Sequence, residues 1–494
     1  MQSGTVLSAV LDNGNTIEYV FDANAPRGGM KHTFFTPDKQ YAVQFFNDPR
    51  NAADPRIQDR IRTIVGIYNP TLSEADGGAV GNTEKTADYF RQRFCWPVAI
   101  VRQPEFGIVC PTYPKNFFFG SDASTVLNLC GKDKKSNWFT GRNRKYLSPD
   151  ERGSFRTMLG TAIGLSRTVR RMHQAGLAHS DLSCNNVLID PRTGASVVID
   201  IDSLVVPNKY APEVVGTRGY IAPEVLATLV LDYNDPRRAL PCVQTDLHAL
   251  PVLIYEYLFF RHPLIGPKIY DPNDAEHDDF LGLGEMATFI ENPNDTSNRP
   301  PDLNVNNATI QSLSKGLEEL FIRAFVKGLH DPSERPTAME WERELLRAWD
   351  NLVPCGNPQC EKKWFILRDA QNPVCPFCKT RIHRPITQLF FKSELRGRKG
   401  VYRDKSEAVI YDRMPLYDWH VFSNVHNDEK ANTEMSAYIA FYNGMQLLVN
   451  KNIDGMLSPS GRLVPKGSAV ELKNGAAFKM TGGENGLLCE VVVS

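Results

Sequence analysis

The stretch HSDLSCNNVLIDPRTGASVVIDID, residues 179–202, decides the fold class of this chain. Its later part has the pattern of a β-hairpin, because NVLID and SVVID are strand-forming runs on either side of the turn PRTG. Such a hairpin brings Asp181, Asn186 and Asp200 close together. Phosphoryl transfer needs a set of this kind, in which one carboxylate accepts the proton of the attacking hydroxyl. The other carboxylate and the amide oxygen hold Mg²⁺ against nucleotide phosphates.

The same stretch resembles the protein kinase family. HSDL at 179–182, followed by Asn186, is similar to the catalytic loop HRDLxxxN, and IDID at 199–202 stands where the family has DFG. The resemblance implies a two-lobed kinase-like fold that uses ATP. It also implies that Asp181 is the general base and that Asn186 and Asp200 are magnesium ligands.

Further segments resemble the family in the expected order. GTRGYIAPE at 216–224 is similar to the end of the activation segment, which forms the peptide platform in protein kinases. Asp246 resembles the buried helix aspartate of the family, and Arg335 resembles the arginine that pairs with the APE glutamate, here Glu224. Five motifs in the right order are far more specific than any one of them.

Three residues of these motifs depart from the family pattern. Ser180 replaces the arginine of HRD, so control by activation-loop phosphorylation is in doubt. Ser183 replaces the lysine that serine/threonine kinases direct at the γ-phosphate, which leaves the substrate class open. Asp202 replaces the DFG glycine and puts the hinge freedom of that segment in doubt.

The largest departure concerns the phosphate-binding lysine. YAVQFF at 41–46 resembles the strand that carries VAIK, but Gln44 stands in the place of the lysine. The segment PRGGMKHTF at 26–34 offers a replacement, since Lys31 lies in the Gly-rich loop that would cover the phosphates with Gly28 and Gly29. This arrangement is similar to the with-no-lysine kinases. The alternative is that Lys31 is a solvated strand lysine.

The acidic partner of that lysine stays open at this stage. A helix is expected from Asp54 and Pro55, a plausible N-cap and first helical residue, through Ile57, Ile61, Ile64 and Tyr68. Asp59 on this helix is the best candidate on spacing. Glu74 and Glu84 are also possible, although they belong to a segment, 71–86, that is expected to be a loop.

Four cysteines form a metal-binding pattern. Cys355 and Cys360 make one knuckle, and Cys375 and Cys378 make a second one, with 14 residues between the two knuckles. Four thiolates at this spacing suit a tetrahedral, structural Zn²⁺ site, with Zn–S distances of about 2.3 Å. An iron–sulfur centre and free thiols are the competing interpretations.

The expected fold class is α+β, in the form of a two-lobed kinase-like fold followed by a zinc ribbon and a small β-sandwich. We expect a kinase N-lobe over 1–112, a helix-rich C-lobe over 113–350, a zinc ribbon over 351–385 and a β-rich domain over 386–494. The last domain weakly resembles a forkhead-associated (FHA) sandwich. Such phosphothreonine readers need an arginine, and Arg396 and Arg398 are present, but a plain structural or docking sandwich is the alternative.

Composition narrows the setting. A net charge of -1 argues against nucleic acid or membrane surfaces as partners, and the N-terminus MQSGTVLSAVLDNG lacks a secretory pattern. The most apolar stretch, Leu247–Phe260, is too short to span a bilayer and is expected to be a buried helix. The scattered remaining cysteines do not form a disulfide framework, which favours a reducing cytoplasm.

The combination of this divergent kinase with a trailing zinc ribbon resembles bacterial kinase-like proteins encoded with a von Willebrand A protein and a metal-dependent phosphatase. Such sets are associated with tellurite resistance genes. The resemblance implies these two proteins, and a protein substrate, as partners.

The leading hypothesis is an ATP- and Mg²⁺-dependent protein serine/threonine kinase. A pseudokinase scaffold that binds nucleotide or partners without phosphotransfer is the main alternative, because the strand lysine and the DFG glycine are absent. A small-molecule phosphotransferase is a third possibility, against which the peptide-platform motif at 216–224 argues.

Overall fold

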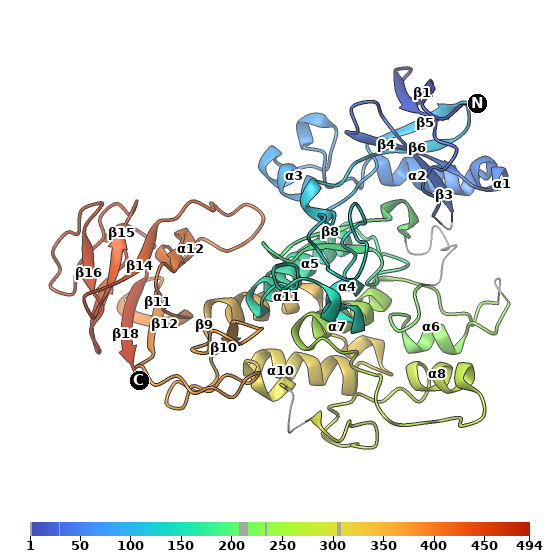
Figure 1. Cartoon of the computed structure of the whole chain (residues 1–494). Helices are drawn as coiled ribbons and strands as arrows, with labels where there is room; N and C mark the ends of the chain where they lie inside the picture. Colours follow the sequence, from blue (N-terminus) through green and yellow to red (C-terminus); the bar gives the residue numbers. More distant parts are fainter. Residues whose placement is uncertain (1, 29, 207–215, 233–234, 304–307) are drawn as a thin grey trace. The chain divides into compact units, whose positions relative to one another are not determined.

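The computed structural model describes residues 2–28, 30–206, 216–232, 235–303 and 308–494 (Figure 1). The chain forms two compact units. The first comprises Met1–Gly153, Gly160–Pro300 and Leu320–Trp341, and the second comprises Ser154–Leu159, Pro301–Glu319 and Glu342–Ser494. The division into four domains at 112, 350 and 385 stays a prediction.

The first unit begins with a closed six-stranded barrel in the order β1-β2-β3-β4-β6-β5. Its strands are β1 (Val6–Leu11), β2 (Thr16–Val20), β3 (Lys31–Phe35), β4 (Tyr41–Phe46), β5 (Ala99–Gln103) and β6 (Gly107–Pro111). Strand β4 is the run YAVQFF, the strand expected at 41–46. Side chains that include Phe34, Val43 and Val109 fill one face of this sheet, while Phe46, Ile108 and Cys110 pack on the other.

Helix α2 (Pro55–Val65) covers the second of these faces. Asp54 caps it as expected, since its side chain accepts from the Arg56 backbone N–H and Pro55 occupies the first turn. Ile57 and Ile61 are buried and belong to the same cluster as Phe46 and Ile108. The helix ends at Val65, before Tyr68, where the C-cap Gly66 leaves the helical backbone angles with φ -87° and ψ -111°.

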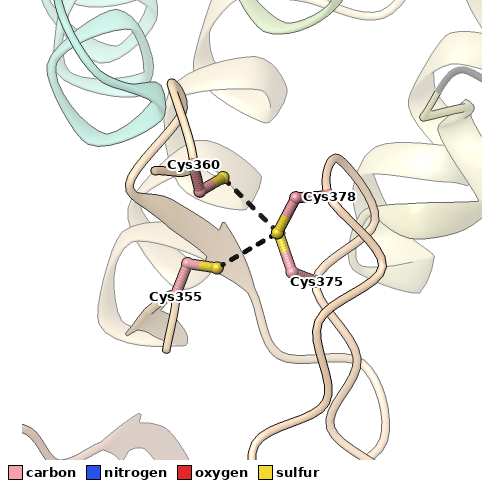
Figure 2. A group of neighbouring side chains, drawn as sticks. All are labelled: Cys355, Cys360, Cys375 and Cys378. Atoms are coloured by element: carbon pink, nitrogen blue, oxygen red, sulfur yellow. Dashed lines mark hydrogen bonds between the residues drawn. The ribbon is translucent and has the colours of Figure 1, made fainter. Parts of the chain in front are cut away.

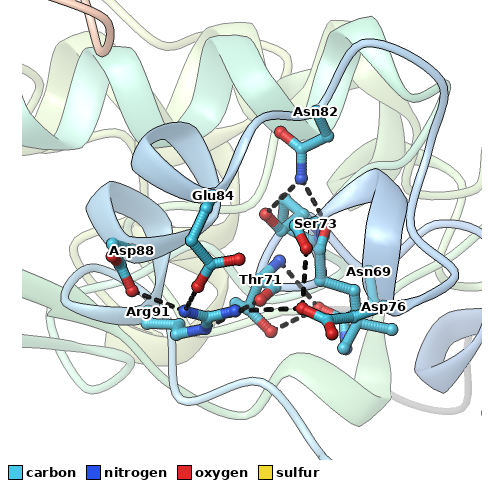
Figure 3. A network of polar contacts seen from close by, with 10 residues as sticks. Asn69, Thr71, Ser73, Asp76, Asn82, Glu84, Asp88 and Arg91 are labelled. Carbon is cyan, nitrogen blue, oxygen red and sulfur yellow. Dashed lines mark hydrogen bonds and ion pairs between the residues drawn. The ribbon is translucent and has the colours of Figure 1, made fainter.

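The expectation of a plain loop over 71–86 is wrong in part, because helix α3 (Glu84–Arg91) begins within it. A polar network orders the rest (Figure 3). The Arg91 guanidinium donates to the Thr71 carbonyl at 3.0 Å and to the Glu84 carboxylate at 2.5 Å. The Asn82 side-chain amide donates to the backbone carbonyls of Pro70 and Leu72. These side chains satisfy backbone groups that a Gly- and Asn-rich segment leaves unpaired.

The rest of the first unit is mainly helical. Its principal elements are the hairpin β7 (Val187–Asp190) and β8 (Ala195–Val198), helix α7 (Val243–Phe259) and most of helix α5 (Phe155–Gln174), whose residues up to Leu159 belong to the second unit. Helix α7 contains the most apolar stretch of the sequence and is buried on nearly all sides, as expected. Within the described residues, no helix combines the length and apolar character that a membrane span requires.

Shorter helices complete the chain. They are α1 (Pro49–Ala53), α4 (Asn137–Thr140), α6 (Pro223–Ala227), α8 (Ala275–Leu283), α10 (Lys315–Ile322), α11 (Ala338–Asp350) and α12 (Asp418–Val421). A π-helical stretch (Arg323–Lys327) follows α10 directly.

The second unit contains the cysteine module and the C-terminal β region. The module opens with the hairpin β9 (Leu352–Pro354) and β10 (Trp364–Ile366). The β region has two four-stranded sheets, β12-β11-β18-β17 and β13-β14-β15-β16. Their strands are β11 (Thr387–Leu395), β12 (Arg398–Val409), β13 (Pro415–Leu416), β14 (Ala437–Tyr442), β15 (Met445–Asn450), β16 (Ala469–Glu471), β17 (Ala477–Lys479) and β18 (Leu488–Val493). Both sheets contribute to one buried apolar cluster, which is the arrangement of a sandwich.

An arginine links parts of this second unit that are distant in sequence. The guanidinium of Arg156 lies 4.9 Å from the ring centroids of Trp349 and Trp364 and 5.3 Å from that of Tyr411. Each such contact is worth roughly 0.5–2 kcal/mol, depending on exposure. Arg156 therefore joins helix α11, the cysteine hairpin and the β region within the unit.

Candidate functional site

The β7–β8 hairpin places the predicted site residues beside one another. Val187 pairs with Val198 in antiparallel register, and the Ile199 backbone N–H donates to the Asn186 carbonyl at 3.0 Å. Asn186 and Asp200 therefore lie at the same end of the hairpin, as the sequence predicts. All four residues of β7 are buried, so the surrounding protein packs against this strand of the hairpin.

Asp181 and Asn186 are in direct contact. The Asn186 amide nitrogen donates to Oδ2 of Asp181 at 2.9 Å and to the Asp181 carbonyl at 2.8 Å. Both bonds use the nitrogen, which leaves the amide oxygen as a possible metal ligand. Oδ1 of Asp181 is buried and has no hydrogen-bond partner among the described residues. Asp181 also lines a cavity of about 10 Å³ together with Gly216 and Thr217, and its unpartnered Oδ1 can accept a hydrogen bond from a hydroxyl.

A buried aspartate fixes the backbone of this loop. Asp246, in the first turn of α7, is 1% exposed. Its Oδ2 accepts from the His179 backbone N–H at 2.9 Å and lies 3.0 Å from Nε2 of His173. His179 in turn accepts from the Asp181 N–H at Nδ1 and donates from Nε2 to the Ile199 carbonyl at 3.0 Å. The expectation of a buried helix aspartate at 246 is confirmed. Through His179, Asp246 connects the loop of Asp181 to the strand end before Asp200.

Asp200 adopts a backbone conformation that side chains other than glycine rarely take. Its φ of 62° and ψ of 39° lie in the left-handed region. Non-glycine residues in sparsely populated backbone regions cost of order 1–3 kcal/mol and cluster at functional sites. The side chain stays 44% exposed, so a metal ion can reach it. Desolvation by the surrounding protein, and then the neighbouring Asp202 carboxylate, raise the pKa of Asp200.

Lys31 lies at the start of β3, and its ammonium group lies near Asp200. Only 9% of its side chain is exposed. Its ammonium nitrogen is 3.9 Å from Oδ1 of Asp200 and contacts the carboxylate of Asp202 directly. Burial alone would lower the pKa of Lys31, but these two carboxylates outweigh it and raise the pKa above its ordinary value. Lys31 is therefore a charged, buried cation within the cluster and not a solvated strand lysine.

Lys31 and Gln44 lie on one face of the barrel sheet. Thr33 is the cross-strand partner of Gln44, and the Gln44 amide donates to its hydroxyl at 3.3 Å. Because side chains alternate between faces along a strand, Lys31 shares the face of Thr33 and hence of Gln44. The lysine of β3 thus occupies the same face that a lysine at position 44 would occupy.

The acid that pairs with Lys31 was not identified from the sequence. Asp59 is exposed on α2, Glu84 pairs with Arg91, and Glu74 accepts from the Gly81 backbone N–H. In the described ranges, the two carboxylates within ion-pair distance of Lys31 are Asp200 and Asp202. The sequence contains one signal for this pairing, the acid Asp202 in place of the DFG glycine. From the sequence alone, this replacement indicates only a departure from the family pattern.

The Gly-rich segment is described in part. Gly28 lies in a turn where its N–H donates to the Lys31 carbonyl at 2.8 Å, and its own carbonyl accepts from the Asn47 side chain at 3.0 Å. Gly28 therefore stands next to the backbone of Lys31. Gly29 lies outside the described residues.

The expected pairing of Arg335 with Glu224 is confirmed. The two side chains make a bidentate contact, with both nitrogen–oxygen distances at 2.8 Å. Arg335 is almost fully buried and also donates to the backbone carbonyls of Gly328 and Gln244. This pair anchors the start of helix α6 and with it the segment that ends the peptide-platform motif.

The four predicted metal cysteines converge in the second unit (Figure 2). The sulfurs of Cys355 and Cys378 are 3.4 Å apart and those of Cys360 and Cys375 are 4.0 Å apart. All four lie within 4.8 Å of one another. A tetrahedral site with Zn–S bonds of about 2.3 Å requires sulfurs about 3.8 Å apart, so the cluster has the size of a zinc site.

Comparisons with known proteins identify the segment that contains most of this site. Residues 123–344 match the family model of the protein kinase domain. The match includes the catalytic-loop and activation-segment residues but begins after Lys31. Among solved structures, a crystal structure of a Toxoplasma gondii specific rhoptry antigen kinase domain is similar, with 15% sequence identity and a TM-score of 0.40. That similarity covers 71% of this chain and 87% of the other. No curated protein matched in a sequence search.

Proposed function

We propose that this chain, which carries a protein kinase-like domain, is an ATP- and Mg²⁺-dependent protein serine/threonine kinase. The observation that supports it most is the convergence of four groups: the carboxylates of Asp181 and Asp200, the amide of Asn186 and the buried ammonium of Lys31. One cation and a set of oxygen ligands on rigid strands are what phosphoryl transfer requires.

Each group has a defined task in the proposed reaction. Asp181 accepts the proton of the substrate hydroxyl through its unpartnered Oδ1. The hydroxyl oxygen then forms a bond to the γ-phosphorus, the bond to the β,γ-bridging oxygen breaks, and the electron pair leaves with ADP. Lys31 neutralises charge on the α- and β-phosphate oxygens.

Magnesium would neutralise the phosphates and orient the γ-phosphoryl group when bound. Hard cations take oxygen ligands, and the Asp200 carboxylate and the Asn186 amide oxygen supply them. The fit is supported by the exposed carboxylate of Asp200 and by the hydrogen bonding of Asn186 through its nitrogen alone. Gly28 would cover the phosphates beside Lys31, and the same role for Gly29 is proposed from the sequence alone.

The choice of serine and threonine as acceptors is proposed from the resemblance of the catalytic loop and the peptide-platform motif to protein kinases. Incubation of the purified protein with γ-labelled ATP, Mg²⁺ and a protein substrate, followed by phosphoamino-acid analysis, tests both parts. Label on serine and threonine is expected. Nucleotide binding with no transfer under any of these conditions would instead establish the pseudokinase scaffold.

The cysteine cluster is proposed to hold one structural Zn²⁺. Four sulfur ligands leave no open position, so the ion would hold two knuckles together and take no part in chemistry. Each knuckle is followed by a residue with positive φ, Lys363 after Cys360 and Lys379 after Cys378. Metal analysis should report about one zinc per chain.

The β region over 386–494 is proposed to be a docking domain, with an FHA-like phosphothreonine reader as its specific form. Arg396 and Arg398 lie at the turn between β11 and β12 and line an open hollow together with Lys399, Arg403 and Lys479. Binding of a phosphothreonine peptide by the whole chain, weakened in Arg396→Ala and absent for the unphosphorylated peptide, is the expected result. Equal binding of both peptides would contradict the reader.

The partners are proposed from the sequence resemblance alone. They are a von Willebrand A protein and a metal-dependent phosphatase, with a cytoplasmic location that keeps the cysteine thiols reduced. Co-purification of the tagged chain with these two proteins from cells that encode the set is the test. Their absence from the purified material would contradict this assignment.

A further inference from the structure

Lys31 has an ion-pair partner that the proposed reaction does not yet use. In protein kinases the phosphate-binding lysine must be held by an acid on the helix that packs against the sheet. Here Asp59 on the corresponding helix α2 is exposed, and the described residues give Lys31 no pair from α2 or α3. Burial of an ammonium group without a strong ion-pair partner would destabilise the folded state. The acid that pairs with Lys31 therefore determines whether this buried cation is stable.

Asp202 meets the requirements of that partner. Its side chain is 10% exposed and contacts the Lys31 ammonium directly, whereas Asp200 lies further away, at 3.9 Å, and is 44% exposed. The carboxylate that is closer to Lys31 and more buried therefore belongs to Asp202, the residue that replaces the glycine of DFG.

The backbone around Asp202 holds it in place. Residues 201–203 form a short 3₁₀ turn in which Ile201 is fully buried, and Leu204 is buried directly after it. Val205 then makes two backbone hydrogen bonds with Ala178, at 2.9 and 3.1 Å. Buried side chains and the backbone pairing of Val205 with Ala178, the residue before His179, therefore fix Asp202 independently of helix α2.

We infer that Asp202 is the positioning residue for Lys31, in place of an acid on helix α2. The inference rests on the proposed role of Lys31 as the phosphate cation. Its consequence is regulatory: the cation is tied to the segment that carries the metal ligand Asp200, so a movement of α2 does not release it.

The test is a double-mutant cycle with Lys31→Met and Asp202→Asn, both close in size to the native residues. Two quantities are measured for the whole chain: the urea midpoint without nucleotide and the affinity for ATP with Mg²⁺. Each single change leaves a buried charge unpaired or removes the cation. We expect both to lower the midpoint and the double variant to lose clearly less than the sum of the two.

For ATP affinity we expect a loss of roughly 10- to 100-fold from Lys31→Met and a similar loss from Asp202→Asn, with no further loss in the double variant. Asp59→Asn is the comparison variant on α2 and should change neither quantity. Additive losses in the urea midpoint, or a loss of ATP affinity from Asp59→Asn equal to that from Asp202→Asn, would overturn the inference.

The two proposals fail in different ways. Coupled midpoints with no phosphotransfer by the native chain would remove the kinase function and leave the Lys31–Asp202 pair established. Phosphotransfer by the native chain with uncoupled midpoints would leave the kinase function and remove the positioning role. Should Asp202→Asn alone fail to fold, the double variant still reports whether removal of the lysine restores folding.

Discussion

The cysteine cluster and the Lys31 site are both polar centres, but they are assembled in opposite ways. All four cysteines lie between residues 355 and 378, and two local turns bring their sulfurs within 4.8 Å. Lys31 and Asp202 are 171 residues apart and meet only when a barrel strand lies against the catalytic-loop region. The first centre depends on local spacing and the second depends on the whole fold of its unit, which determines how each should respond to perturbation.

The largest effect is expected at the cluster. Structural zinc contributes an apparent binding free energy of about 10–16 kcal/mol in small metal-dependent modules, and this energy is also folding energy. Cys375→Ser, at a fully buried ligand, should release the zinc and unfold the cysteine module. Zinc content and near-UV circular dichroism measure this outcome.

The first unit should keep its nucleotide affinity in the same variant, because its site takes no residue from the module. Cys130→Ser, at an exposed cysteine outside the cluster, is the matched control and should retain the metal. A folded chain with four reactive thiols and no zinc would contradict the metal assignment.

The second largest effect is expected from Asp200→Asn. The change replaces an anionic oxygen ligand by an amide while keeping a residue that tolerates the left-handed backbone at this position. Mg²⁺-dependent ATP affinity and phosphotransfer should be lost, and the fold should remain. Calorimetric titration with ATP, with and without Mg²⁺, measures this. Transfer at the native rate would exclude Asp200 as the metal ligand and make Asp202 the next candidate.

The contrast between a centre built from local spacing and one built by the whole fold also explains which features the sequence predicts. The four cysteines, the hairpin that joins Asn186 to Asp200, and the Arg335–Glu224 pair all follow from spacing or motif order, and their geometry is as expected. The partner of Lys31 could not be found in this way, because a contact over 171 residues leaves no local period in the sequence. Helix α3 was missed for a different reason: its order comes from side-chain contacts such as that of Arg91 with Thr71, inside a segment whose composition favours a loop.

A partly buried glutamate in the first unit makes a contact that depends on the whole fold and also on pH. Glu256 on α7 accepts from the Tyr220 hydroxyl at 2.6 Å, and burial raises its pKa from 4.5 to about 7. The folded state therefore binds more protons than the unfolded state between pH 4.5 and 7. Stability from this group falls as pH rises through that window, by about 3 kcal/mol in all, and is constant above it.

Glu256→Gln should remove this dependence and keep an acceptor for Tyr220. We expect the variant to exceed the native chain in urea midpoint above pH 7 and to equal it near pH 4.5. Glu285→Gln, at an exposed position, is the control and should follow the native curve. Parallel curves for the native chain and Glu256→Gln would show that this glutamate has an ordinary pKa.

The smallest effect is expected from changes at Lys31 and Gln44, and these changes test the Lys31 site most directly. A charge-assisted hydrogen bond to phosphate is worth about 1.5–3 kcal/mol, so Lys31→Ala should weaken ATP binding or turnover by roughly 10- to 100-fold. Gln44→Ala should weaken ATP binding much less, because a neutral amide adds little to a phosphate contact.

Lys31 pairs with Phe46 across the strands, which makes Gln44 its diagonal neighbour on the same face. A lysine at position 44 could then reach the same phosphates, and adding Gln44→Lys to Lys31→Ala should restore part of the loss. Titration of the three variants with ATP and Mg²⁺ decides the matter, and equal, small losses for Lys31→Ala and Gln44→Ala would refute the relocated lysine.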